Sequence, residues 1–172
     1  MTNGRSLDKK IVFPEGVPWV DVLTESAFFK GIRPEELDRI ALISQPVSFD
    51  RGNPIFAAGQ EASSLFLVGQ GEVELRFSID HLNGPVELTL LTVKRGDMFG
   101  WSSFAGRLTY ALSAHAVTDS ELYRIPAERL RKLCRENVEL GYLIMNNVAT
   151  VISSRFVAMQ GLVKHIVQGS AR

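Results

Sequence analysis

The spacing of apolar residues along this chain changes twice, from helical periodicity to alternation and back again. Val20, Leu23 and Ala27 recur at helical intervals, which predicts one helix over residues 19–30. A second helix is expected to begin at Pro34, because proline is favoured at the first helical position and two glutamates follow it. Its predicted apolar face consists of Leu37, Ile40, Ala41 and Ile43.

From Gln45 onward, apolar and polar residues alternate between turn signals, which is typical of strands. The turns are expected at 51–54, at Gly59 and at 69–71, and a longer loop is expected at 83–85. Further strands are predicted at 86–93, 111–117 and 120–126. Short strands at this spacing indicate an antiparallel sandwich or a small barrel.

Helical spacing returns at Pro126, with a short helix and then a long one over residues 137–168. A heptad seam is predicted on the long helix at Met145, Val148, Ile152, Arg155, Met159, Leu162 and Ile166. A second stripe, made of Leu140, Ile144 and Val151, is expected to face the strands. Two interpretations fit these stripes: the seam pairs with a second copy in a homodimer, or both stripes form one wide face on a single core.

Residues 96–116, with the sequence GDMFGWSSFAGRLTYALSAHA, predict a glycine-cornered strand, a one-turn helix and another strand. This is the layout of a phosphate-binding cassette, in which backbone N–H groups at a short helix start hold an anion. Candidate ligand-binding residues are Phe99, Gly100, Trp101, Ser102, Ser103, Arg107, Tyr110, Ala111 and, from the long helix, Arg155.

The ordered glycines at positions 52, 59, 71, 96 and 100, followed by a long helix, resemble the cyclic-nucleotide-binding domain family. The matching segments are FFKGIRPEELDRIA, RGNPIFAAGQEASSLFLVGQGEVEL, GDMFG and ALSAHAVTDSELYRI. The resemblance implies an α+β, mainly β fold: a double-stranded β-helix (jelly-roll) barrel with N-terminal helices and a C-terminal dimerisation helix. The chain then divides into an N-terminal arm (1–18), the barrel with its flanking helices (19–136) and the long helix (137–168).

The resemblance also implies where the ligand chemistry lies, and there the chain departs from the family. Trp101 occupies the position of the glutamate that binds the ribose, and Tyr110 that of the arginine that neutralises the cyclic phosphate. Losing one partner of a buried charge pair costs about 2–5 kcal/mol, so tight cyclic-AMP binding is not expected. The two rings either fill the volume of the missing nucleotide or stack on another aromatic ligand.

The other candidates each have two interpretations. Arg107 is either an anion-binding residue or a solvated loop charge, and the serines at 102 and 103 either donate to a ligand or cap the one-turn helix. Arg155 either reaches the pocket, where its five donors would suit an acidic or carbonyl-bearing ligand, or fixes the register of the seam. The chain also resembles a single-domain branch of the family in which GWS follows the cassette strand.

Composition narrows the function classes. The 172 residues include 19 basic and 19 acidic side chains, and this balance argues against a bare nucleic-acid binder. No segment resembles a membrane span or a secretory signal, and the single cysteine, Cys134, suits a reducing cytoplasm. The histidines at 81, 115 and 165 have no metal-ligand spacing, and no catalytic motif is present, so neither a metal site nor an enzyme is expected.

Two functional hypotheses follow. The first is a cytoplasmic, dimeric sensor module whose ligand biases the helix pair and whose signal is read by a protein partner. The second is a dimeric interaction scaffold with a closed pocket. A third possibility is the sensor part of a transcriptional regulator, although no DNA-binding domain and no direct DNA binding are expected, since the chain ends soon after the long helix.

Overall fold

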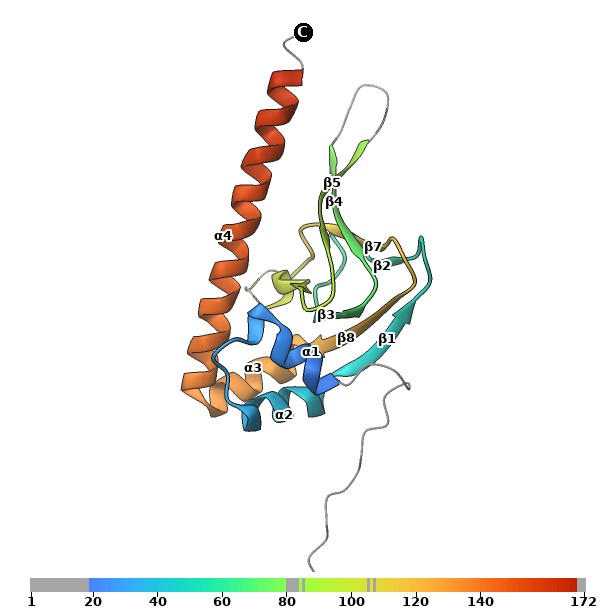
Figure 1. The fold of residues 1–172 in the computed structure, drawn as a ribbon. Helices are drawn as coiled ribbons and strands as arrows, with labels where there is room; N and C mark the ends of the chain where they lie inside the picture. Colours follow the sequence, from blue (N-terminus) through green and yellow to red (C-terminus); the bar gives the residue numbers. More distant parts are fainter. Residues whose placement is uncertain (1–18, 80–83, 85, 105, 107, 170–172) are drawn as a thin grey trace, which may run out of the picture.

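Two antiparallel sheets stacked against a layer of helices make up the part of the chain that the computed structural model describes (Figure 1). It describes residues 19–79, 84, 86–104, 106 and 108–169, with the backbone alone for 19, 20 and 162–169. The predicted N-terminal arm (1–18) and most of the predicted loop at 83–85 lie outside these residues.

The two sheets have the interleaved strand order of a jelly roll, as the resemblance implied. The first runs β1 (Gln45–Phe49), β8 (Ser120–Pro126), β3 (Ser64–Gln70) and β6 (Met98–Phe99). The second runs β2 (Pro54–Phe56), β7 (Ser113–Ala116), β4 (Val73–Ile79) and β5 (Val86–Val93). Neighbouring strands come from distant parts of the sequence, and the pairings among the described residues form two separate sheets rather than one closed cylinder. One predicted turn needs correction, because β3 continues through Gly69 and Gln70.

Strand β3 is buried on both of its faces and separates two apolar cores. Leu65 and Leu67 point to one side and contribute to the helical core, the cluster between the first sheet and the helices. Phe66 and Val68 point to the other side and contribute to the jelly-roll core, the cluster between the two sheets. This alternation follows from the period of two along a strand, and it explains why the segment is apolar throughout.

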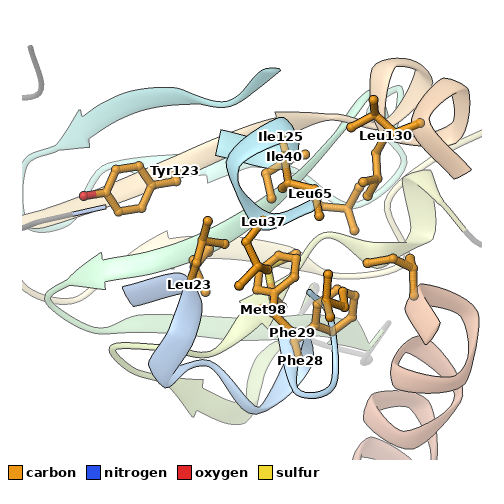
Figure 2. Close-up of a cluster of buried hydrophobic side chains, with 14 of the residues drawn as sticks. Leu23, Phe28, Phe29, Leu37, Ile40, Leu65, Met98, Tyr123, Ile125 and Leu130 are labelled. Atoms are coloured by element: carbon orange, nitrogen blue, oxygen red, sulfur yellow. The ribbon is translucent and has the colours of Figure 1, made fainter. Parts of the chain in front are cut away.

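The helical layer is formed by both ends of the chain. Its elements are α1 (Trp19–Glu25), the 3₁₀ turn η1 (Ala27–Phe29), α2 (Pro34–Ile43), α3 (Ala127–Glu136) and α4 (Val138–Gly169). Figure 2 shows how Phe28 and Phe29 of η1 meet Met98 and Leu65 of the first sheet in the helical core. The second helix begins at Pro34 as expected, with Leu37, Ile40 and Ala41 buried and Ile43 partly buried.

The single helix predicted over residues 19–30 is wrong, because it is broken at Ser26. That residue has extended backbone angles (φ −68°, ψ 122°), and its hydroxyl accepts a hydrogen bond from the N–H of Phe28 (3.3 Å). The hydroxyl also donates to the carbonyl of Gly96 at 2.6 Å. The break therefore joins the N-terminal helices to the turn that precedes β6.

The long helix α4 presents two distinct apolar faces. The face toward the domain contains Leu140, Ile144 and Val148, each at most 1% exposed, followed by partly buried Val151 and Arg155. The opposite face leaves Met145, Ile152 and Met159 exposed. The predicted seam thus combined residues of two faces: Val148 and Arg155 belong with the stripe that faces the domain. The side chains of Leu162 and Ile166 lie outside those described.

Candidate functional site

The cassette backbone has the predicted turn geometry. Gly100 follows β6 in the left-handed region (φ 74°) and leads into the 3₁₀ turn η2 (Trp101–Ser103). A Cβ atom at this position would lie 3.0 Å from the carbonyl oxygen of Ser64 and 3.2 Å from the ring of Phe66. Only glycine avoids both the contact and the strained backbone angle here.

Tyr110 is part of the jelly-roll core. Its ring stacks on Phe56, with 3.7 Å between centroids and 13° between planes. Its hydroxyl donates to the carbonyl of Ser64 (2.8 Å) and accepts from the N–H of the same residue (3.2 Å). Burial raises the pKa of this phenol above 10.0. The residue at the family's arginine position is therefore a neutral side chain with both ends satisfied inside the protein.

Little space remains in the cassette for a ligand. Phe66 stacks on Phe99 at 5.3 Å, and Phe56 lies 5.9 Å from Phe99, which completes an aromatic cluster around Tyr110. The remaining cavity has a volume of about 30 Å³, roughly the share of one water molecule in the liquid. Since sites for drug-sized ligands have volumes of about 300–1,000 Å³, this geometry favours the filled-pocket interpretation over a stacking platform.

The remaining cassette candidates are used in different ways. Trp101 borders the small cavity but packs, partly buried, against the helical core. The hydroxyl of Ser103 donates to the carbonyl of Gly100 (2.9 Å), so this serine closes its own turn. Ser102 is buried and Ala111 is exposed at the cavity rim. Arg107 lies outside the described residues.

A second, larger cavity lies between α4 and the turn before β6. It has a volume of about 260 Å³ and is lined by Arg155, Asn147 and Ser154 of the helix, Gly96 and Asp97 of the turn, and Phe28. The Nε atom of Arg155 is buried and has no hydrogen-bond partner among the described residues. Burial lowers the pKa of this guanidinium, and the nearby Asp97 carboxylate opposes that effect.

Of the residues that line this second cavity, the sequence analysis named only Arg155 and missed Asp97 and Asn147. Asn147 donates to the carbonyl of Phe28 at 2.6 Å and so connects α4 to η1 across the cavity floor. Asp97 accepts from the N–H of Lys94 at 2.9 Å and stabilises the turn. The Gly-Asp pair of the cassette was visible as a turn signal, but nothing in the sequence connected it to residue 155.

Other chemistry is not apparent in the described part of the chain. No three His, Cys, Asp or Glu side chains in it gather into a group that could bind a metal. Cys134 is half-buried on α3, and burial raises the pKa of its thiol, as expected for a structural cysteine. Among the described residues, no helix is both long enough and apolar enough to cross a membrane.

Comparison with known proteins agrees with this fold. The model of the cyclic nucleotide-binding domain family matches residues 46–137. The cyclic AMP receptor protein of Thermus thermophilus is 33% identical over 130 residues, which cover 76% of this chain and 57% of that protein.

Solved structures give the same result. The catabolite activator protein of Thermus thermophilus is similar with a TM-score of 0.66 and 30% identity, over 81% of this chain and 62% of that one. A Geobacter metallireducens protein named for cyclic nucleotide binding has a TM-score of 0.67 and 32% identity, over 82% of this chain and 99% of its own.

The chain therefore belongs to the cyclic nucleotide-binding domain family, a family of regulatory sensor domains. It spans about half the length of the curated relatives that it matches.

Proposed function

We propose that this chain is a regulatory module that acts through a pair of α4 helices and holds no cyclic nucleotide between its sheets. The observation that carries the proposal is the cassette cavity of about 30 Å³, filled by Tyr110 and the phenylalanines around it. A ligand there would have to displace a ring whose stacking and hydrogen bonds are already satisfied. The role is regulatory rather than catalytic, and a cytoplasmic location stays a prediction.

The nucleotide part of the proposal is tested by calorimetric titration with cyclic AMP and cyclic GMP near millimolar concentration. We expect no saturable heat from either nucleotide. A fitted dissociation constant in the micromolar range would contradict the proposal, because it would require the aromatic cluster to open.

Helix pairing is supported by the exposed face of α4. Tyr142, Met145, Ile152, Phe156 and Met159 follow a heptad spacing, and all of them are at least 38% exposed. A stripe of large apolar side chains on one face of a helix is covered at least cost by a second copy through two-fold symmetry. This stripe replaces the seam predicted from the sequence.

Sedimentation equilibrium of matched variants tests the pairing. Phe156→Asp places a charge at the centre of the stripe and should convert a dimer to a monomer. Val157→Asp makes the same kind of change at an exposed apolar residue of the same helix (63% exposed) that lies outside the stripe, and it should leave the dimer intact. A wild-type chain that is monomeric at all concentrations would contradict the pairing.

A second candidate is the sensor part of a DNA-binding regulator. It is favoured by relatives whose names describe cAMP-activated global transcriptional regulators and of which this chain spans 56%. Direct DNA binding by this chain is not expected from its balanced charge, and a gel shift at low salt distinguishes the two candidates.

A further inference from the structure

The cavity beside Arg155 is separate from the cassette cavity, since the two share no lining residue. The cassette cavity is lined by Phe56, Gly100 and Tyr110 between the sheets, whereas this cavity lies outside them, against η1 and the turn at Gly96. Met98 and Phe28, which Figure 2 places together in the helical core, form part of its apolar wall. The cavity therefore stays open although the cassette is filled.

The guanidinium of Arg155 is the unusual group in this cavity. Within the described residues, no carboxylate lies within ion-pair distance of it, and its buried Nε has no acceptor. A buried donor without an acceptor costs free energy that a folded chain usually avoids. Solvent or a bound ligand can then supply the acceptor that the described residues do not.

Arg131, which also borders a cavity, differs from Arg155 in its partners. That arginine borders a larger hollow of about 620 Å³, but its Nη2 donates to the carbonyl of Ser103 (2.8 Å). Its Nη1, a buried nitrogen that likewise has no hydrogen-bond partner in the described part of the chain, lies 3.6 Å from a carboxylate oxygen of Glu128 and so has an ion-pair partner. Arg131 therefore has both a hydrogen-bond acceptor and an ion-pair partner in the protein, whereas Arg155 has neither among the described residues.

The rest of the lining indicates what else a ligand must carry. The hydroxyls of Thr150 and Ser154 donate to carbonyls of their own helix, at 3.0 Å and 2.8 Å, so toward the cavity their oxygens can only accept. Asp97 adds a carboxylate to the lining. The site therefore offers a cation for an acidic group together with acceptors for a donor group.

We infer that the cavity between α4 and the Gly96 turn binds a small carboxylic acid that also bears an amino or hydroxyl group. The carboxylate would accept from Arg155, and the amino or hydroxyl group would donate to Asp97 or to the helix hydroxyls. A volume of about 260 Å³ suits a molecule of roughly eight or nine non-hydrogen atoms, at the share of one water for each. This deepens the proposed function, on which it rests, by naming the ligand class of the sensor.

The test is calorimetric titration of the full chain with alanine, serine, lactate, propionate, succinate and inorganic phosphate. At least one of the first three should bind, and more tightly than propionate does. Arg155→Gln should weaken that binding roughly tenfold to a hundredfold, because a charged hydrogen bond is lost. Arg129→Gln, the same change at an exposed arginine of α3, should leave it unchanged.

Arg155→Lys, which keeps the charge but loses the Nε donor, should bind with intermediate affinity.

The inference is overturned if none of the carboxylates binds, if Arg155→Gln binds as tightly as the wild type, or if phosphate or propionate binds as tightly as the hydroxy and amino acids. Thermal unfolding of each variant shows that it is folded. Sedimentation of the same samples keeps the outcomes separate, since a dimer without carboxylate binding contradicts this site and not the helix pairing.

Discussion

The space between the sheets and the cavity beside α4 make opposite use of polar atoms. Between the sheets, Tyr110 has a stacking partner and two hydrogen bonds, and almost no volume is left. Beside α4, Arg155 has a buried donor without a partner and faces open volume. The first arrangement stabilises the fold, whereas a buried donor without an acceptor lowers stability unless solvent or a ligand supplies the acceptor.

The position at which the family resemblance implies a phosphate-binding arginine is thus occupied by a core residue, Tyr110, while the unpartnered donor lies in the other cavity. We therefore expect substitution of Tyr110 between the sheets to lower the free energy of unfolding, and substitution of Arg155 beside α4 not to lower it.

The largest effect is expected for Tyr110→Arg, which restores the family's residue type at the cassette. The charge would be buried among phenylalanines without a partner, so the free energy of unfolding should fall by about 3–5 kcal/mol. Cyclic AMP should still not bind. Urea unfolding measures the loss, with Leu108→Arg as a control, since Leu108 is 85% exposed in the same loop. A stable Tyr110→Arg variant that binds cyclic AMP would show that the cassette is only masked.

A smaller, pH-dependent effect is expected from the Tyr110 hydroxyl. Because burial raises its pKa above 10.0, the folded state keeps a proton that the unfolded chain releases. Its contribution is complete below pH 10 and is lost as the pH rises through the folded pKa, by at most about 1.4 kcal/mol per pH unit.

Tyr110→Phe should therefore lower the free energy of unfolding by about 1 kcal/mol at neutral pH, through the lost hydrogen bonds, and flatten its decline above pH 10. Urea titrations on either side of that pH measure both quantities. Some decline should remain, because burial also raises the pKa of Tyr123. An unchanged slope in Tyr110→Phe would mean that the phenol is hydrated rather than buried.

The smallest effect is expected for Arg155→Met. Removing a donor that has no acceptor should leave the free energy of unfolding unchanged or raise it by up to about 1 kcal/mol. Arg39→Met is the contrast, because Arg39 pairs with the buried Glu36 (3.2 Å) and with Glu136, and its loss should cost about 1–2 kcal/mol. If Arg155→Met proved the more costly of the two in urea unfolding, Arg155 would have a structural partner and the contrast between the two regions would fail.

Most of the fold could be predicted from local spacing, because strands and helices carry their period in the sequence. The break at Ser26 could not, since the apolar spacing continues through it and the acceptor of its hydroxyl, Gly96, lies 70 residues away. The heptad pattern predicted the spacing of the apolar residues on α4 but not which of them face the domain. Whether Val148 faces the domain or a partner depends on contacts with η1 that no local pattern encodes.

The candidate site was only partly predictable for the same reason. The family resemblance located Trp101 and Tyr110 and indicated the lost charges, and the structure then distinguished between filling and stacking. For Arg155, the sequence left two interpretations open. Its placement beside Asp97, and Asn147's hydrogen bond to η1, depend on how α4 packs across the turn.

The anchoring of α4 at one end has a mechanical consequence. Its start is fixed by the hydrogen bond from the Asn137 amide to the buried Glu36 (3.0 Å) and by the buried residues through Val148, while Figure 1 shows its last turns extending away from the helical layer. Helices rise about 1.5 Å per residue, so the stretch from Arg155 to Gly169 is a lever roughly 21 Å long. A tilt of about 5° at Arg155 would move its tip by roughly 2 Å. A small molecule bound at Arg155 that tilted α4 by this angle would thus displace the helix end far enough for a partner protein to distinguish the two positions.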